Sequence, residues 1–256
     1  MRCLILIASV FALTNPQTRA ALDPADQVNP LIGATGPTNL ANYGGVCPWV
    51  TPPHGMTHWT PMTQENQISR LPFRSEQETL IGFMGSHQPT VWMGDYGFLT
   101  LMPESGARHI QPRDRGLKIV PGSQISKPYL YSVELENAND PASGKIGVQM
   151  TATARCALFQ FTYPKSAASH LFIEMSRVPG YQGWIKVSSD RREIVGYNSG
   201  RHNLWAGRHM GPELKKFKGW FVIQFEKPFA LFSTWEETKA AGTNASPAKT
   251  QIHDEK

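Results

Sequence analysis

Apolar and polar residues alternate along much of this chain, a pattern typical of β-strands that bury one face. Clusters of Gly, Pro, Asn and Ser separate the alternating segments, and helical periodicity is scarce. Residues 34–62 are rich in Gly and Pro and are expected to form loops. The spacing predicts an all-β fold, a large antiparallel β-sandwich in one domain. The strand-like segments span residues 129–135, 147–154, 157–163, 170–175, 193–197 and 220–225.

The first 21 residues have the pattern of a secretory signal peptide. Arg2 precedes an apolar run from Cys3 to Leu13, and small residues, Ala20 and Ala21, follow a polar stretch. The apolar run is too short to span a bilayer, and no other run approaches that length. The sequence therefore predicts an exported protein, secreted or periplasmic, with no membrane span.

The carboxy-terminal residues 236–256 lose the apolar pattern and are rich in Ala, Lys, Thr and Glu. This composition is typical of a linker or a frayed end. The sandwich is accordingly expected to span residues 22–235. Asn244 lies in an Asn-Ala-Ser sequon that could carry a glycan in a eukaryotic host.

Charge and cysteine content narrow the possible classes of function. The 25 basic and 20 acidic residues give a net charge of +5, which falls to +3 without Arg2 and Arg19 of the leader. So small a surplus gives no indication of nucleic-acid binding. Outside the leader only Cys47 and Cys156 remain, which could form one disulfide, or Cys156 could be buried in a strand. No paired cysteine spacing predicts a metal site.

Residues 80–103 carry the densest set of candidate binding residues. Trp92 offers an apolar plate, while His87, Gln88 and Asp95 offer directional hydrogen bonds among several glycines and prolines. This combination suits a sugar, whose C–H face stacks on aromatic rings while its hydroxyls need donors and acceptors. The alternative is a β-hairpin turn with a core Trp and a satisfied His.

Glycoside hydrolysis usually needs two carboxylates facing each other across the bond. The spacing pairs none of the candidate acids, and those on strands are expected at the surface. His54 and His58 are interpreted as loop residues rather than metal ligands. A second polar-aromatic segment, with His202, Trp205 and His209, is interpreted as a surface turn. The candidate acids are Asp95, Glu104, Glu134, Glu174 and Asp190, and the tryptophans expected in the core are Trp184, Trp220 and Trp235.

An ordered series of short motifs resembles the amino-terminal domain of glycoside hydrolase family 92, the calcium-dependent exo-acting α-mannosidases. The series covers nearly all of residues 27–235. Each motif is weak alone, but their order is specific. The motifs are Val28-Asn29-Pro30-Leu31-Ile32-Gly33, Thr51-Pro52-Pro53-His54-Gly55-Met56, Thr60-Pro61, Ile81-Gly82-Phe83, Ser86-His87, Gly94-Asp95-Tyr96-Gly97, Leu101-Met102-Pro103, Tyr131-Ser132-Val133-Glu134-Leu135, Thr151-Ala152-Thr153-Ala154-Arg155, Phe161-Thr162-Tyr163-Pro164 and Phe225-Glu226-Lys227-Pro228-Phe229.

The resemblance implies a sandwich similar to galactose mutarotase, followed in the family by a carboxy-terminal (α/α)6 barrel. That barrel supplies the acid, the base and most calcium ligands of an inverting mechanism. We therefore expect no catalytic residue, metal ligand or cofactor in this chain, in which the barrel has no counterpart. The amino-terminal domain lends loop residues to the sugar pocket, here expected to be Trp92, His87, Gln88 and Asp95.

Two departures from the family pattern concern this pocket. Gln88 to Met93 replaces a continuation rich in Ser, Thr and Gly, and Cys47-Pro48-Trp49 replaces a simpler approach to the Pro-x-Gly-Met turn. Either could change the preferred sugar or linkage. The expected partners are α-mannosides and the barrel, and the expected role is to shape a mannoside pocket without hydrolysing glycosides alone. A stand-alone carbohydrate-binding module, a purely structural sandwich and a complete enzyme with a truncated reading frame are the alternatives.

Overall fold

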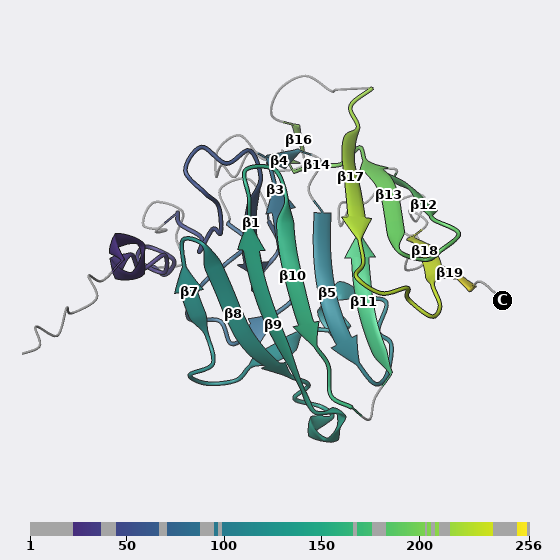
Figure 1. Ribbon diagram of the computed structural model, residues 1–256, viewed down its shortest axis with the longest axis horizontal. Helices are drawn as coiled ribbons and strands as arrows, with labels where there is room; N and C mark the ends of the chain where they lie inside the picture. Colours follow the sequence, from purple (N-terminus) through teal and green to yellow (C-terminus); the bar gives the residue numbers. More distant parts are fainter. Residues whose placement is uncertain are drawn as a thin grey trace, which may run out of the picture.

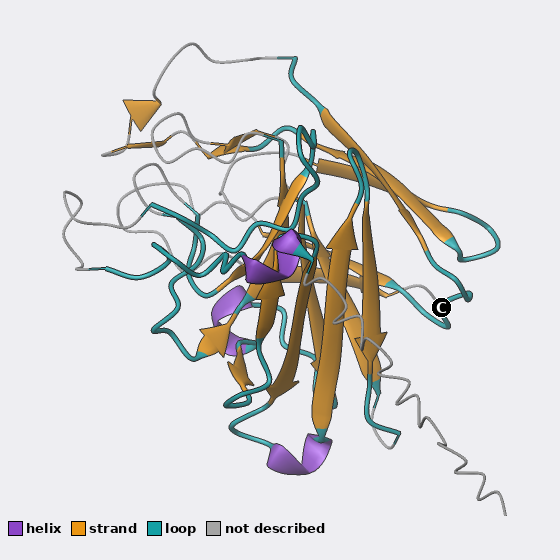
Figure 2. Ribbon diagram, turned by 60° about the vertical axis from the view of Figure 1, so that its left-hand side comes forward, coloured by secondary structure: helices purple, strands orange, loops and turns teal. Residues whose placement is uncertain are grey.

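The computed structural model has an all-β fold, as the alternation predicts. Strands dominate, and the helical elements of the described residues are short 3-10 turns, η1 (Pro24–Gln27), η3 (Pro112–Asp114) and η4 (Pro141–Ser143) (Figure 2). Among the described residues, no helix has the length and apolar character needed to cross a membrane. The structure describes residues 23–36, 45–66, 71–87, 95–96, 99–165, 168–175, 183–202, 204–205, 208–209, 216–237 and 250–254.

One antiparallel sheet has the strand order β1-β3-β5-β11. Its strands are β1 (His58–Met62), β3 (Gly82–Ser86), β5 (Leu99–Ser105) and β11 (Ser169–Glu174). Every residue of β3 and β5 is buried, which means that both faces of this sheet are covered. Trp49 contributes to this cover, because it packs against Met62 and Met84 and also against a small cluster that includes Cys47 and Phe73.

A second antiparallel sheet has the order β10-β9-β8-β6-β2, with β7 paired to β8 (Figure 1). Strands β8 and β9 alternate between buried and exposed residues, as expected for strands with one face in a core. The strands are β2 (Thr79–Leu80), β6 (Leu117–Ile119), β7 (Ile125–Lys127), β8 (Leu130–Glu136), β9 (Lys145–Ala152) and β10 (Ala157–Thr162).

The main core lies between these two sheets and makes the molecule a β-sandwich. The ring of Phe159 on β10 meets the ring of Trp59 edge-on, with 5.0 Å between centroids. Phe83 on β3 similarly meets Tyr131 on β8 at 6.3 Å. These contacts join the sheets by edge-to-face aromatic packing, which adds to the apolar area that each ring buries.

A third sheet, β12-β13-β17, packs one of its faces against the same core. Its strands are β12 (Gly183–Val187), β13 (Glu193–Asn198) and β17 (Gly219–Gln224). Phe221 and Ile223 face inward, whereas Trp220 points outward and is 57% exposed. Trp184 is 42% exposed, so the prediction that these two tryptophans are core residues is wrong, while Trp235 does pack against the core.

Three short strand pairs complete the described fold: β4 (Asp95–Tyr96) with β14 (Arg201–His202), β15 (Leu204–Trp205) with β16 (Arg208–His209), and β18 (Ser233–Glu237) with β19 (Thr250–Asp254). The boundary predicted after Trp235 thus falls inside β18, and the end of the chain returns to pair Ile252 with Trp235. The leader and Asn244 lie outside the described residues.

Strand β1 lies in a segment that its Gly and Pro content predicts to be a loop. Pro61 is compatible with the strand because β1 is at the edge of its sheet, where a missing N–H costs no ladder hydrogen bond. The two cysteines also differ from expectation. Cys47 is buried and Cys156 is exposed, and both are free thiols. Burial raises the pKa of the Cys47 thiol to about 12, which keeps it unreactive.

Candidate functional site

The loops at one end of β1 and β3 form the candidate site, which we call the loop end. Antiparallel pairing sets His58, the first residue of β1, opposite Ser86, the last residue of β3. His87 follows directly and is exposed. The chain therefore presents two imidazoles at the point where the segment carrying Trp92 leaves the sheet.

His58 is half-buried and is held by an aromatic neighbour. The ring of Trp49 meets the imidazole nearly edge-on, with 6.1 Å between centroids and 82° between planes. Burial lowers the pKa of His58, and the nearby charge of His87 acts in the same direction, against a raising contribution from the Ser86 backbone. A neutral imidazole at neutral pH has one donor and one acceptor nitrogen, which suits hydroxyl groups.

The two polar-aromatic segments found in the sequence meet at this end of the molecule. Asp95 pairs with His202 and Tyr96 with Arg201, which brings positions more than a hundred residues apart onto adjacent strands. The paired strands β4 and β14 lie beyond the end of β3 in Figure 1. The surface turn predicted around His202 is therefore part of the same loop cluster as Asp95.

Of the four predicted sugar-binding residues, the structure describes His87 and Asp95. His87 ends the described part of the loop, and Asp95 is placed by its backbone in β4. Gln88 and Trp92 lie outside the described residues, so their roles stay predictions. His58 was not among the predicted binding residues, because its Gly- and Pro-rich surroundings predict a loop and give no local signal that it pairs with Ser86.

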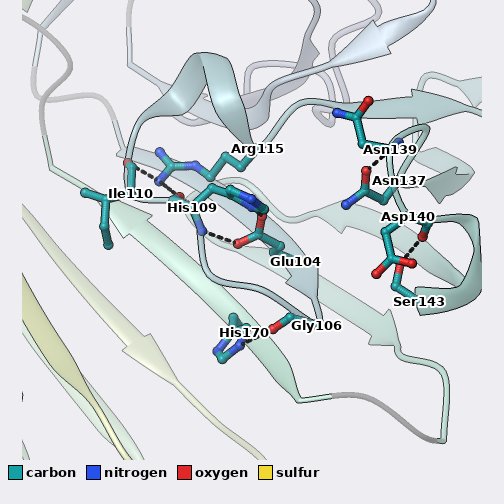
Figure 3. Close-up of polar contacts among 10 residues, drawn as sticks. All are labelled: Glu104, Gly106, His109, Ile110, Arg115, Asn137, Asn139, Asp140, Ser143 and His170. Carbon is teal, nitrogen blue, oxygen red and sulfur yellow. Dashed lines mark hydrogen bonds and ion pairs between the residues drawn. The ribbon is translucent and has the colours of Figure 1, made fainter.

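Two buried carboxylates have structural partners rather than free faces. Glu104 is paired with His109, whose backbone N–H donates to Oε2 at 3.0 Å and whose Nδ1 lies 2.5 Å from Oε1 (Figure 3). Glu174 forms an ion pair with the buried Arg115, which also donates to the Ile110 carbonyl at 2.8 Å. The prediction that Glu174 faces the surface is wrong, because Arg115 compensates its charge inside.

Two further candidate acids, Glu134 and Asp190, are exposed and bonded locally. Glu134 is 3.8 Å from the Lys145 ammonium. The hydroxyl of Ser188 donates to Asp190 and is the main cause of the lowered pKa of that carboxyl. Neither acid lies on the strands that form the loop end. This part of the chain thus offers groups that can bind a polar ligand, but no facing pair of carboxylates among the residues described.

The described residues also contain no group of three His, Cys, Asp or Glu side chains that could hold a metal ion. Calcium prefers six to eight oxygen ligands, several of them carboxylates. The donor set of the described chain does not fit such an ion.

Comparisons with known proteins give consistent family and fold matches. The profile of the glycosyl hydrolase family 92 N-terminal domain matches residues 27–253. Among solved structures, the inverting mannosidase BT2199 of Bacteroides thetaiotaomicron superposes with a TM-score of 0.66 at 24% identity, covering 90% of this chain and 28% of that one. The α-mannosidase BT3965 of the same organism gives 0.55 at 20% identity, covering 80% and 31%.

A further family 92 glycosyl hydrolase, ccman5, gives a TM-score of 0.57 at 14% identity and covers 91% of this chain and 30% of its own. No curated protein matches the chain. At these identities the structural matches establish a shared fold. The chain spans less than a third of the length of these solved relatives.

Proposed function

The chain belongs to glycosyl hydrolase family 92, whose N-terminal domain it matches, and we propose that it forms one wall of a mannoside pocket. Two of the solved relatives that share its fold are named as mannosidases, and this chain covers 28% and 31% of them. The observation that carries the proposal is the backbone pairing of two polar-aromatic segments, Asp95 opposite His202, beyond the end of β3, the strand that His87 follows and whose last residue pairs with His58 (Figure 1). The chain thus gathers hydrogen-bonding groups at one end.

In this proposal Trp92 stacks on the sugar ring and His87, Gln88 and Asp95 bond its hydroxyls. His58 accepts or donates a further hydrogen bond as a neutral imidazole. The edge contact with Trp49 fixes the ring, which reduces the entropy lost on binding. The chain selects and orients the sugar but does not cleave it.

The catalytic carboxylates and any calcium are assigned to the larger part of the family architecture, which lies outside this domain. The buried acids support this division, since Glu104 and Glu174 are already bound to His109 and Arg115. We also propose that the protein is exported, because the first 21 residues have the pattern of a signal peptide. An exported location gives such a protein access to extracellular glycans.

Nuclear magnetic resonance titration of the full chain with α-mannobiose tests the pocket. We expect shifts of the His58 and His87 imidazole resonances, which are lost in Trp92→Ala and absent with the β-linked disaccharide cellobiose. No hydrolysis of aryl α-mannosides is expected, with or without calcium. Unchanged imidazole signals at saturating mannobiose would contradict the binding role, and turnover that copurifies with the chain would contradict the division of labour.

A further inference from the structure

The outer face of the β12-β13-β17 sheet exposes a row of aromatic side chains that the core does not use. Trp184, Tyr197 and Trp220 occupy paired positions on the three strands and therefore share one face. Trp184 and Trp220 are 42% and 57% exposed. We call this surface the aromatic face, and it includes Val222, which is 59% exposed.

The three rings hold one another in position. Trp184 stacks on Tyr197 with 6.1 Å between centroids and 21° between planes. Trp220 meets Tyr197 edge-on at 5.0 Å, and the Lys218 ammonium lies 4.4 Å from the Tyr197 centroid. The central tyrosine is thus enclosed, while the indoles keep exposed surface. Rings fixed in this way lose little freedom when a ligand stacks on them.

Polar side chains continue the aromatic face along the strands. Lys186, Val195 and Val222 form the next row, and Glu193 and Gln224 the row after it. Gln224 donates to Glu193 at 3.2 Å. Four residues of strand separate this amide–carboxylate pair from the aromatic row, a distance of about 13 Å. The face therefore has flat aromatic rings at one end and a hydrogen-bonding pair at the other, separated by more than the length of one sugar ring.

We propose that the aromatic face is a second saccharide-binding surface, which takes an oligosaccharide laid along the strands. One sugar unit stacks its C–H face on Trp220 with Lys218 beside it, and a later unit bonds Glu193 and Gln224. Lys218 stands at one end, Glu193 and Gln224 at the other, and the row between them combines Val195 and Val222 with Lys186. This mixture of apolar and hydrogen-bonding groups matches a chain of sugar units better than a wholly apolar partner. This surface would hold a glycan near the protein independently of the loop end.

Affinity electrophoresis of the full chain in gels containing soluble α-mannan, with titration of α-mannotriose, tests the surface. The choice of mannose rests on the proposed function, so maltotriose is titrated in parallel. We expect Trp220→Ala to weaken binding about tenfold and Trp220→Phe to retain part of it. Leu158→Ala, which truncates an apolar side chain that is 70% exposed on β10, is the matched control and should bind as the wild type does.

Failure of this inference is distinguishable from failure of the pocket. If maltotriose binds with the same dependence on Trp220 and mannotriose does not, the aromatic face stands and the mannoside function falls. If Trp92→Ala abolishes all binding while Trp220→Ala changes nothing, the pocket stands and this inference is overturned. If neither trisaccharide binds, this inference is also overturned. A dimer that Trp220→Ala converts to a monomer would overturn it as well.

Discussion

Strands β8 and β17 both alternate their side chains between two faces, but they use the alternation differently. In β8 the apolar residues Tyr131, Val133 and Leu135 are buried and the residues between them face outward. In β17 both sets are apolar, with Phe221 and Ile223 against the core and Trp220 and Val222 in contact with solvent. The inward face of β8 accounts for its apolar side chains apart from the half-buried Leu130 at the start of the strand, whereas the inward face of β17 accounts for only half of them.

The outward residues of β17 therefore call for an explanation other than the core. Exposed apolar side chains that stand alone need none, but a contiguous aromatic row with a polar rim is typical of a binding surface. The loop end differs from both strands. There, strand pairing brings polar residues together, whereas β8 brings apolar side chains together by burial. Substitutions on the two strands and at the loop end should therefore separate residues that the fold requires from residues that it does not.

The largest loss of stability is expected from Arg115→Ala. This change leaves Glu174 buried without its ion-pair partner and also removes the cation over the Phe172 ring at 4.3 Å. The free energy of unfolding should fall by about 3–5 kcal/mol, measured by urea denaturation. The double variant Arg115→Met with Glu174→Leu should recover most of the loss, and a double variant as unstable as the single one would argue against charge as the cause.

A matched pair of valines compares β8 with β17 directly. Val133 is 1% exposed and Val222 is 59% exposed. Val133→Ala should lower the free energy of unfolding by about 2 kcal/mol, because it removes buried methyl groups and leaves a cavity. Val222→Ala should stay within about 0.5 kcal/mol of the wild type. Equal losses in the two variants would show that the aromatic face is covered in the folded protein.

The smallest effect is a pH dependence from His58. Its pKa is lowered in the folded state, so the unfolded chain takes up a proton first as the pH falls through about 6.5, the ordinary histidine value. Stability should therefore decrease below that pH until the folded His58 is protonated too. Denaturation curves at pH 7.5 and 5.5 measure this, and His58→Gln should reduce the difference between them. An unchanged difference would place the titrating group elsewhere.

The sequence predicted the sandwich well because its strands carry strong local signals. The alternation in residues 129–135 and 147–154 appears as β8 and β9 with nearly the same bounds. The sequence could not distinguish the exposed Trp184 and Trp220 from a tryptophan that packs against the core, such as Trp235. Alternation shows that a strand has two faces, but it does not show which face is covered. The pairing of Asp95 with His202 depends on long-range topology, which no local pattern contains.

The family relation came from ordered motifs rather than from any catalytic residue. The profile match over residues 27–253 confirms that assignment. The placement of Glu174 could not be predicted, since a carboxylate on an alternating strand usually faces solvent and its partner Arg115 lies far away in the sequence. Buried ion pairs of this kind are specified by three-dimensional contacts.

The central claim is that this chain separates residues for folding from residues for binding sugars. The most direct test measures both the free energy of unfolding and the affinity for α-mannotriose in Val133→Ala, His87→Ala and Trp220→Ala. We predict that the valine variant loses stability and keeps its affinity. The other two should keep their stability within about 1 kcal/mol and lose affinity. Wild-type affinity in both the His87 and Trp220 variants would contradict the claim.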